Sequence, residues 1–273
     1  MPNLVADPEL EQQERLARQM GSMSILQHLD ELRKRIIHSI AAVGICFLAL
    51  WYKADTLLDL MSWPIKDALA KNHLPTMLNY TSPTDPFNIK LKLGLIAGIF
   101  VACPYLLYQV WMFISPGLYR HEKRFIFPFL IMSVGLFVGG GYFGYRFVFP
   151  VALEFLIQQG AGMNAMITVD KYTSLFLTVI LGLAIIFELP VVLGFAGMMG
   201  VVTPKFLFKH IRGAVLIFFV IAAILTPTTD IMNMSIYAAP MIVLYIASIG
   251  IVWLVHPKQR RKRAEKRKDQ GLD

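Results

Sequence analysis

The stretch LGLIAGIFVACPYLLYQVWMFISPGLY, residues 93–119, contains no charged side chain in 27 positions. About 20 apolar residues in a helix cross the roughly 30 Å of hydrocarbon in a bilayer, so this stretch is long enough to span a membrane. Inside lipid the backbone must satisfy its own hydrogen bonds, and a single apolar segment achieves this as a helix. The stretch therefore predicts a transmembrane helix, which Pro104 should bend.

Five further stretches have the same character. Residues 36–52, 125–145, 213–229 and 231–255 contain no Asp, Glu, Lys or Arg, and residues 172–204 are interrupted only by Glu188. We therefore predict an all-α, polytopic membrane protein with six transmembrane helices. The composition agrees, because 16% charged residues lies well below the roughly 25% of soluble domains. A soluble globule, a disordered chain and a disulfide scaffold are excluded.

Lys and Arg are divided unequally between the two sides that six spans define. The side of both termini holds 19 of them and the opposite side 7, so the positive-inside rule places both termini in the cytoplasm, at the inner membrane. We expect a cytoplasmic extension at 1–23 without a signal peptide, a membrane domain at 24–255 and a basic tail at 256–273. The start could equally be Met20 or Met23. The tail suits anionic lipid, and no nucleic acid is needed to explain it.

Two outer connections separate the first four spans. Residues 53–88 show apolar residues at helical spacing, and Pro64 breaks that spacing. This pattern predicts two short interfacial helices within a compact cap. The third span is expected to close at Arg146 and Pro150, with the second outer loop running to Lys171.

The last two spans differ from the others. The fifth, residues 211–226, has 16 residues, which is about 24 Å of helix, and the sixth contains Pro240. A short or kinked pair mismatches the bilayer and must thin it or lean on a partner. The third span carries Gly135-x-x-x-Gly139 and Gly140-x-x-x-Gly144, a spacing that reports close helix packing rather than function.

Glu188 is the clearest polar residue within a span. A charge at the bilayer centre costs roughly 2.5–3.5 kcal/mol, so such a residue is paired, protonated or facing water. One interpretation is a protonated carboxyl bonded to backbone that Pro190 leaves free. The other is a contact point for a substrate or a partner helix, which Thr226 and Asp230 would join if the helices pack that way.

Two further acids, Glu31 and Glu122, lie among basic residues on the predicted cytoplasmic face. Local neutralisation is one explanation for each. Together, two carboxylates at one surface suit a cationic ligand, and bidentate pairing favours guanidinium over ammonium. Cys46 and Cys103 lie inside apolar runs and indicate neither a metal site nor a disulfide. Since nucleotide-binding and catalytic motifs are missing, we expect no enzyme activity and no cofactor.

Four segments resemble TatC, the core subunit of the twin-arginine protein translocase. They are HLDELRKR at 28–35, YQVWMFISPGLYRHEKR at 108–124, FELP at 187–190, and LTP at 225–227 with the following Asp230. The resemblance implies a concave, cup-like bundle with a capped outer side and two short final helices. It also implies the core of a translocase that exports folded proteins across the cytoplasmic membrane, driven by proton-motive force.

In that family the chain is a receptor for twin-arginine signal peptides, acts with TatA- or TatB-type single-span partners, and forms homo-oligomers within the complex. The resemblance assigns signal-peptide binding to Glu31, Arg33, Phe113, Tyr119, Arg120 and Glu122. It assigns partner contact to Glu188 and Thr226, and outer-cap roles to Pro64 and Asp230. A small-molecule or ion secondary transporter is the main alternative, although Glu188 is the single clear midplane acid and no internal repeat is visible.

Overall fold

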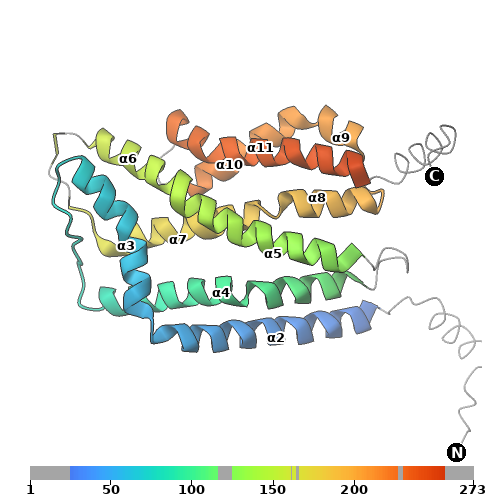
Figure 1. Ribbon diagram of the computed structural model, residues 1–273, viewed down its shortest axis with the longest axis horizontal. Helices are drawn as coiled ribbons and strands as arrows, with labels where there is room; N and C mark the ends of the chain where they lie inside the picture. The colour runs from blue at the N-terminus through green and yellow to red at the C-terminus, as the bar shows by residue number, and fades with distance from the viewer. Residues whose placement is uncertain (1–24, 116–124, 161, 164–165, 227–229, 256–273) are drawn as a thin grey trace, which may run out of the picture.

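The computed structural model describes residues 25–115, 125–160, 162–163, 166–226 and 230–255. Most helices in this part of the chain run side by side along the long axis of the molecule, and α3 (Ala54–Lys71) lies across one end (Figure 1). We call the end that holds α3 the cap end. The opposite end, where α2 begins at Ile25 and α11 ends at Val255, is the base end.

The remaining elements follow in chain order. They are α2 (Ile25–Trp51), α4 (Asp85–Ile114), α5 (Ile126–Phe143), the π-helix η3 (Gly144–Val148), α6 (Phe149–Gln159), α7 (Val169–Ile186), α8 (Leu189–Met198), α9 (Pro204–Lys209), α10 (Ile211–Leu225) and α11 (Ile231–Val255).

Within these described residues, five stretches are long and apolar enough to cross a membrane: Gln27–Trp51, Asp85–Ile114, Ile126–Gln159, Val169–Met198 and Ile231–Val255. The apolar helix α10 is shorter, with 15 residues. The predicted all-α membrane architecture is confirmed. Of the last two helices only α10 is short, because α11 continues through Pro240 for 25 residues.

The third span does not close at Arg146 and Pro150, as the sequence suggested. Instead α5 passes through η3 into α6, and the helical stretch ends at Gln159. The Phe149 N–H donates to the carbonyl of Gly144, five residues back, which is the hydrogen-bonding pattern of a π turn. Pro150 then falls in the first turn of α6, where a missing N–H is tolerated. The connection that was predicted to follow Pro150 therefore begins after α6.

The helix α3 at the cap end is also continuous, so the expected pair of short helices is wrong. Pro64 has no N–H, which deprives the Leu60 carbonyl, four residues back, of its usual partner. The Tyr145 hydroxyl from η3 donates to that carbonyl at 3.0 Å. The Tyr172 hydroxyl from α7 donates to the next carbonyl, that of Met61, at 2.6 Å. Two neighbouring elements thus supply hydrogen bonds at the point where α3 contains its proline.

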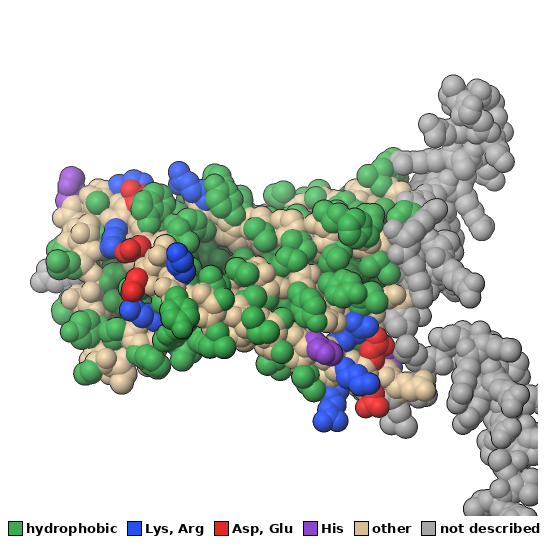
Figure 2. Space-filling view, turned by 60° about the horizontal axis from the view of Figure 1, so that its bottom comes forward, with side chains coloured by type: hydrophobic (Ala, Val, Ile, Leu, Met, Phe, Trp, Pro, Cys, Tyr) green, Lys and Arg blue, Asp and Glu red, His purple; other side chains and the backbone are tan. Residues whose placement is uncertain are grey.

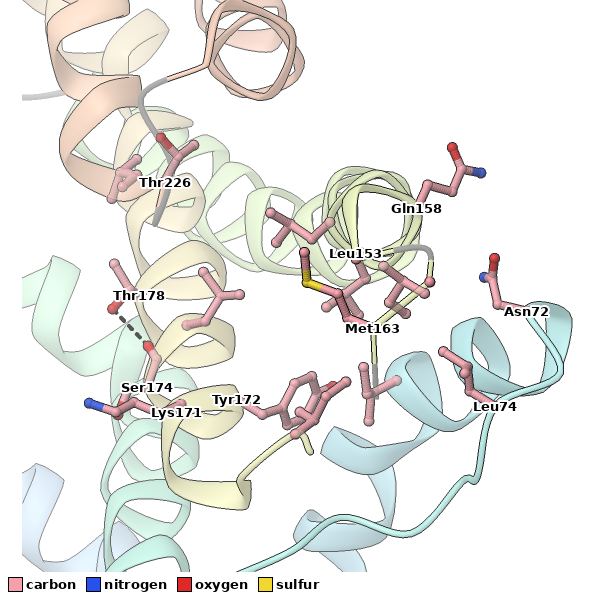
Figure 3. Close-up of a pocket in the computed structure, with 18 of the residues that line it drawn as sticks. Asn72, Leu74, Leu153, Gln158, Met163, Lys171, Tyr172, Ser174, Thr178 and Thr226 are labelled. Atoms are coloured by element: carbon pink, nitrogen blue, oxygen red, sulfur yellow. Dashed lines mark hydrogen bonds between the residues drawn. The ribbon is translucent and has the colours of Figure 1, made fainter. Parts of the chain in front are cut away.

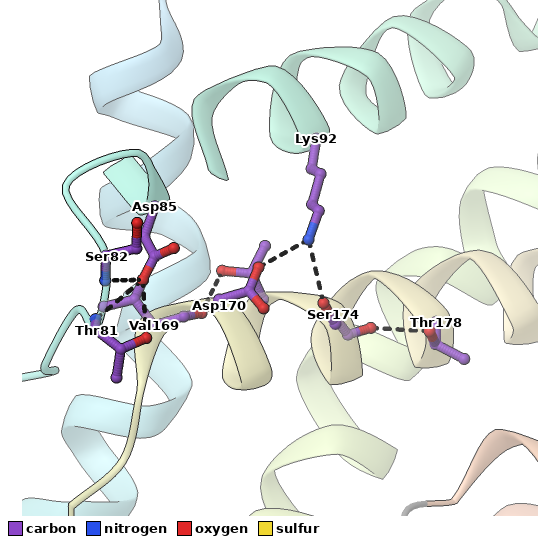
Figure 4. Close-up of polar contacts among 9 residues, drawn as sticks. Thr81, Ser82, Asp85, Lys92, Val169, Asp170, Ser174 and Thr178 are labelled. Carbon is purple, nitrogen blue, oxygen red and sulfur yellow. Dashed lines mark hydrogen bonds and ion pairs between the residues drawn. The ribbon is translucent and has the colours of Figure 1, made fainter. Parts of the chain in front are cut away.

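Long-range contacts hold the cap end together. The Asn79 N–H donates to the Ile167 carbonyl at 3.0 Å, and the Val169 N–H donates to the Asn79 carbonyl at 2.8 Å, which pairs the segment after α3 with the segment before α7. Figure 4 shows Lys92 of α4 reaching Asp170 of α7, with 2.8 Å between ammonium and carboxylate. These contacts support the compact cap that the sequence predicted.

The two glycine pairs of the third span behave differently. A Cβ added at Gly140 would lie 2.6 Å from the ring of Phe187, and one added at Gly144 would lie 3.0 Å from a methyl group of α7. A Cβ at Gly135 or Gly139 would meet no described atom within 4 Å. Only the second pair therefore allows α5 and η3 to approach α7 closely.

Candidate functional site

At the base end, α2 and α4 run side by side in opposite directions (Figure 1), so that α2 carries the predicted residues Glu31 and Arg33 and α4 carries Phe113. The His28 ring stacks on the Phe113 ring, with centroids 4.3 Å apart and planes inclined by 16°. Further along α2, Arg35 reaches Gln109 of α4. Residues three, four and seven positions apart share one helix face, so Glu31 lies on the same face as His28 and Arg35.

Glu31 is held by a network that crosses between the two helices. Its Oε1 accepts hydrogen bonds from Nε of Arg35, at 3.0 Å, and from Nη2 of the same guanidinium. The Nη1 of Arg35 donates to Gln109 Oε1 at 2.9 Å, and Gln109 Nε2 donates to the Tyr105 hydroxyl at 2.6 Å. The other oxygen, Glu31 Oε2, is buried and has no hydrogen-bond partner among the described residues.

Of the other residues predicted for signal-peptide binding, the structure describes two, Arg33 and Phe113. Arg33 is exposed on α2, and Phe113 is half-buried beneath its stacking partner. Tyr119, Arg120 and Glu122 lie outside the described residues. Figure 2 shows one group of charged side chains at the base end, beside the undescribed residues, and another at the cap end. The surface between these groups is largely hydrophobic, as expected for a protein that crosses a bilayer.

Glu188 lies at the break between α7 and α8, where it is the N-cap residue of α8. The Ser133 hydroxyl of α5 donates to Glu188 Oε2 at 2.5 Å, and Trp111 Nε1–H lies 3.4 Å from the same hydroxyl oxygen. Glu188 Oε1 is buried without a partner among the described residues. The described contact of this carboxyl is thus a neighbouring helix, rather than backbone that Pro190 leaves free.

Thr226 lies in different surroundings from Glu188. It is buried on the wall of an open cavity of about 1000 Å³ that residues of α3, α6, α7 and α10 line at the cap end (Figure 3). Ser174 and Thr178 of α7 also line the cavity, and the Thr178 hydroxyl donates to the Ser174 carbonyl at 2.8 Å. Glu188 is not one of the described lining residues, so the two predicted partner-contact residues do not share this cavity.

The two residues predicted for the outer cap, Pro64 and Asp230, each take part in local helix structure. Pro64 is buried within α3, next to the carbonyls that the two tyrosines bind. Asp230 precedes α11 as its N-cap: its Oδ1 accepts the Asn233 N–H at 2.7 Å, and its carbonyl accepts the Met234 N–H at 3.1 Å. Such a cap satisfies amides that the first turn of a helix cannot pair internally.

Several residues of these networks were not predicted from the sequence. Arg35 stands four positions after Glu31, and that spacing was a usable signal for a pair on one helix face. Gln109 and Ser133 gave no comparable signal, because their roles depend on which helices pack together. Among the residues that the structure describes, no group of three His, Cys, Asp or Glu side chains could hold a metal ion.

The apolar helices, with the acids Glu31 and Glu188 bonded between them, define a polytopic α-helical membrane protein. A family model described as Sec-independent protein translocase protein (TatC) matches residues 27–240. The TatC protein of Koribacter versatilis (strain Ellin345) is 51% identical over 266 residues, 97% of each chain. That of Aquifex aeolicus (strain VF5) is 37% identical over 241 residues, covering 87% of this chain and 98% of the relative.

A solved structure agrees with these relatives. It is described as the crystal structure of the twin arginine translocase receptor TatC, and it superposes with a TM-score of 0.74 at 36% sequence identity. The match covers 84% of this chain and 99% of the solved one. The chain belongs to the TatC family of Sec-independent protein translocase proteins. It is a multi-pass membrane protein with a role in protein transport, and it is not an enzyme.

Proposed function

We propose that this chain is the signal-peptide receptor of a twin-arginine translocase, in which Glu31 and Glu122 bind the consecutive arginines of the leader. One observation carries the proposal. Arg35 fixes the carboxylate of Glu31 about one helical turn along α2 from His28, which stacks on Phe113, and Glu31 Oε2 is buried without a partner among the described residues. A buried acceptor left unpaired costs about 1–3 kcal/mol, so this oxygen favours an incoming N–H donor.

A guanidinium suits this oxygen better than an ammonium does. It is planar, always charged, and presents N–H groups in a rigid fork that matches carboxylate geometry. A lysine places one compact, strongly hydrated charge at the same point, and its three N–H donors lie on one rotatable nitrogen rather than in a fixed planar fork. Arg33, Phe113, Tyr119 and Arg120 complete the proposed patch, in line with the family resemblance.

The test compares leaders with two arginines and with two lysines on the full chain in nanodiscs. We expect Glu31→Gln to weaken binding of the two-arginine leader at least about tenfold, because charge-assisted hydrogen bonds contribute about 1.5–3 kcal/mol. Asp30→Asn is the matched control, since Asp30 is the exposed neighbour on the same helix. Unchanged binding by Glu31→Gln, or equal binding of both leaders by the unaltered chain, would refute the proposal.

The same proposal includes the membrane arrangement and the partners. The chain lies in the inner membrane with both termini in the cytoplasm, and its units are the extension 1–23, the membrane domain 24–255 and the tail 256–273. It forms homo-oligomers and exports folded proteins with proton-motive force. Glu188 and Thr226 contact TatA- or TatB-type helices. Glu188→Gln should reduce crosslinks to such partners while leader binding persists; unaltered crosslinks would contradict the contact.

A further inference from the structure

Arg35 donates hydrogen bonds to two different side chains, Glu31 and Gln109, whereas a surface ion pair needs one partner. Its side chain is 19% exposed and that of Glu31 is 20% exposed, so both are largely shielded from water. Nε and Nη2 both donate to one oxygen of Glu31, while Nη1 donates to Gln109. Gln109 is buried and is itself fixed by its hydrogen bond to the Tyr105 hydroxyl.

This arrangement leaves the two oxygens of Glu31 unequal. A carboxylate offers about four acceptor positions, two on each oxygen. The two guanidinium nitrogens that donate to Glu31, Nε and Nη2, both reach Oε1, whereas Oε2 is buried and has no partner among the described residues. The carboxylate is therefore oriented by one oxygen and open at the other.

We infer that Arg35 is a positioning residue of the recognition site: an internal guanidinium, clamped by Gln109, that holds the Glu31 carboxylate in one rotamer and leaves Oε2 for a single guanidinium of the leader. The inference rests on the proposed function, because it specifies how one of the two proposed carboxylates is prepared. It extends that function to Arg35 and Gln109, which would contribute to discrimination without touching the ligand.

Lysine cannot take over this role. Its three N–H donors lie on a single rotatable nitrogen, so it cannot reproduce the fixed geometry in which the separate Nε and Nη1 of a planar guanidinium face Glu31 and Gln109. In Arg35→Lys the charge on α2 is kept, while the orientation of Glu31 is no longer fixed from α4. The carboxylate can then turn either oxygen toward the leader, and the geometric advantage of a guanidinium over an ammonium shrinks.

The experiment measures equilibrium binding of two-arginine and two-lysine leader peptides to the full chain in nanodiscs. The variants are Arg35→Lys, Gln109→Leu and Glu31→Gln, and the matched control is Lys34→Gln, an exposed cation beside Arg35 on the same helix. We expect Arg35→Lys to weaken binding of the two-arginine leader about tenfold, a size typical of coupling between contacting side chains. It should also lower the ratio of two-arginine to two-lysine affinity. Gln109→Leu should move both quantities in the same direction, and Lys34→Gln neither.

The preference ratio separates positioning from general structural support. Weaker binding of both leaders by the same factor would overturn the inference, and so would an unchanged ratio in both Arg35→Lys and Gln109→Leu. Tighter binding by Arg35→Lys would also overturn it, because Arg35 would then be a competitor of the leader. If Arg35→Lys does not fold, the ratio measured with Gln109→Leu decides. Glu31→Gln that binds like the unaltered chain would instead defeat the proposed function.

Discussion

Removing the hydroxyl of Tyr172 tests how the cap keeps a proline-containing helix continuous. In Tyr172→Phe the ring stays, but the Met61 carbonyl loses a donor at 2.6 Å in a buried position. Because Ile65 still offers a helical N–H to this carbonyl, the loss is that of one net hydrogen bond, about 0.5–1.5 kcal/mol. The hydroxyl of Tyr145 donates at 3.0 Å to the Leu60 carbonyl in an exposed position, so its loss leaves no buried acceptor. We therefore expect less than about 1 kcal/mol for Tyr145→Phe.

Hydrogen exchange read by mass spectrometry can measure these costs locally. Opening free energies differ between parts of one protein, so the amides of α3 report on the cap alone. A cost of about 0.5–1.5 kcal/mol corresponds to exchange of α3 that is about 2- to 12-fold faster in Tyr172→Phe. In Tyr145→Phe the same amides should accelerate less than about fivefold. The amides of α8, at the other end of the molecule, serve as the internal control.

A second substitution examines the cause directly. Pro64→Ala restores an N–H that can bond to the Leu60 carbonyl, so the Tyr145 hydroxyl should matter less in that background. We expect a double-mutant cycle to show coupling between Pro64 and Tyr145. The reasoning is refuted if Tyr172→Phe opens α3 no faster than Tyr145→Phe does. It is also refuted if α3 and α8 accelerate equally, since the loss would then be global.

Two further substitutions test packing and capping. Gly140→Ala should destabilise the fold by about 1–3 kcal/mol in urea unfolding, because the new Cβ would lie 2.6 Å from Phe187. Gly139→Ala is the control, since its Cβ would meet no described atom within 4 Å. Equal unfolding midpoints for the two variants would contradict the close packing at Gly140. Asp230→Ala should cost about 1 kcal/mol and fray the start of α11 in hydrogen exchange, because it removes the acceptor for the Asn233 N–H. Asp230→Ser should retain most protection, and fraying as severe as in Asp230→Ala would count against the cap.

The spans were predictable from the sequence because lipid imposes a rule that each segment must meet by itself. The charge-free run at 231–255 has the same bounds as α11. The positions where prediction failed are those where a neighbour changes the outcome. Pro64 and Pro150 suggest helix ends in isolation, but the hydroxyls of Tyr145 and Tyr172 and the π turn of η3 let both helices continue. Contacts between distant residues are not encoded in local spacing.

The candidate site divides in the same way. Glu31 and Glu188 were recognisable because a carboxyl near or within an apolar span needs an explanation. Their partners were less accessible to sequence reasoning. Gln109 becomes a clamp only because α4 packs against α2 in this register, and Ser133 becomes a donor only because α5 passes the break between α7 and α8.

Glu31 and Glu188 are both bonded within the fold at only one of their two carboxyl oxygens. In each, one oxygen accepts a hydrogen bond from within the fold, from Arg35 or from Ser133, and the other is buried without a described partner. If both oxygens accepted hydrogen bonds within the fold, the carboxyl would have few free acceptor positions for a ligand. If neither did, the whole group would bear the desolvation cost of burial. Satisfying one oxygen fixes the orientation of the group and confines the cost to one atom. That atom is where a donor from outside the chain gains the most.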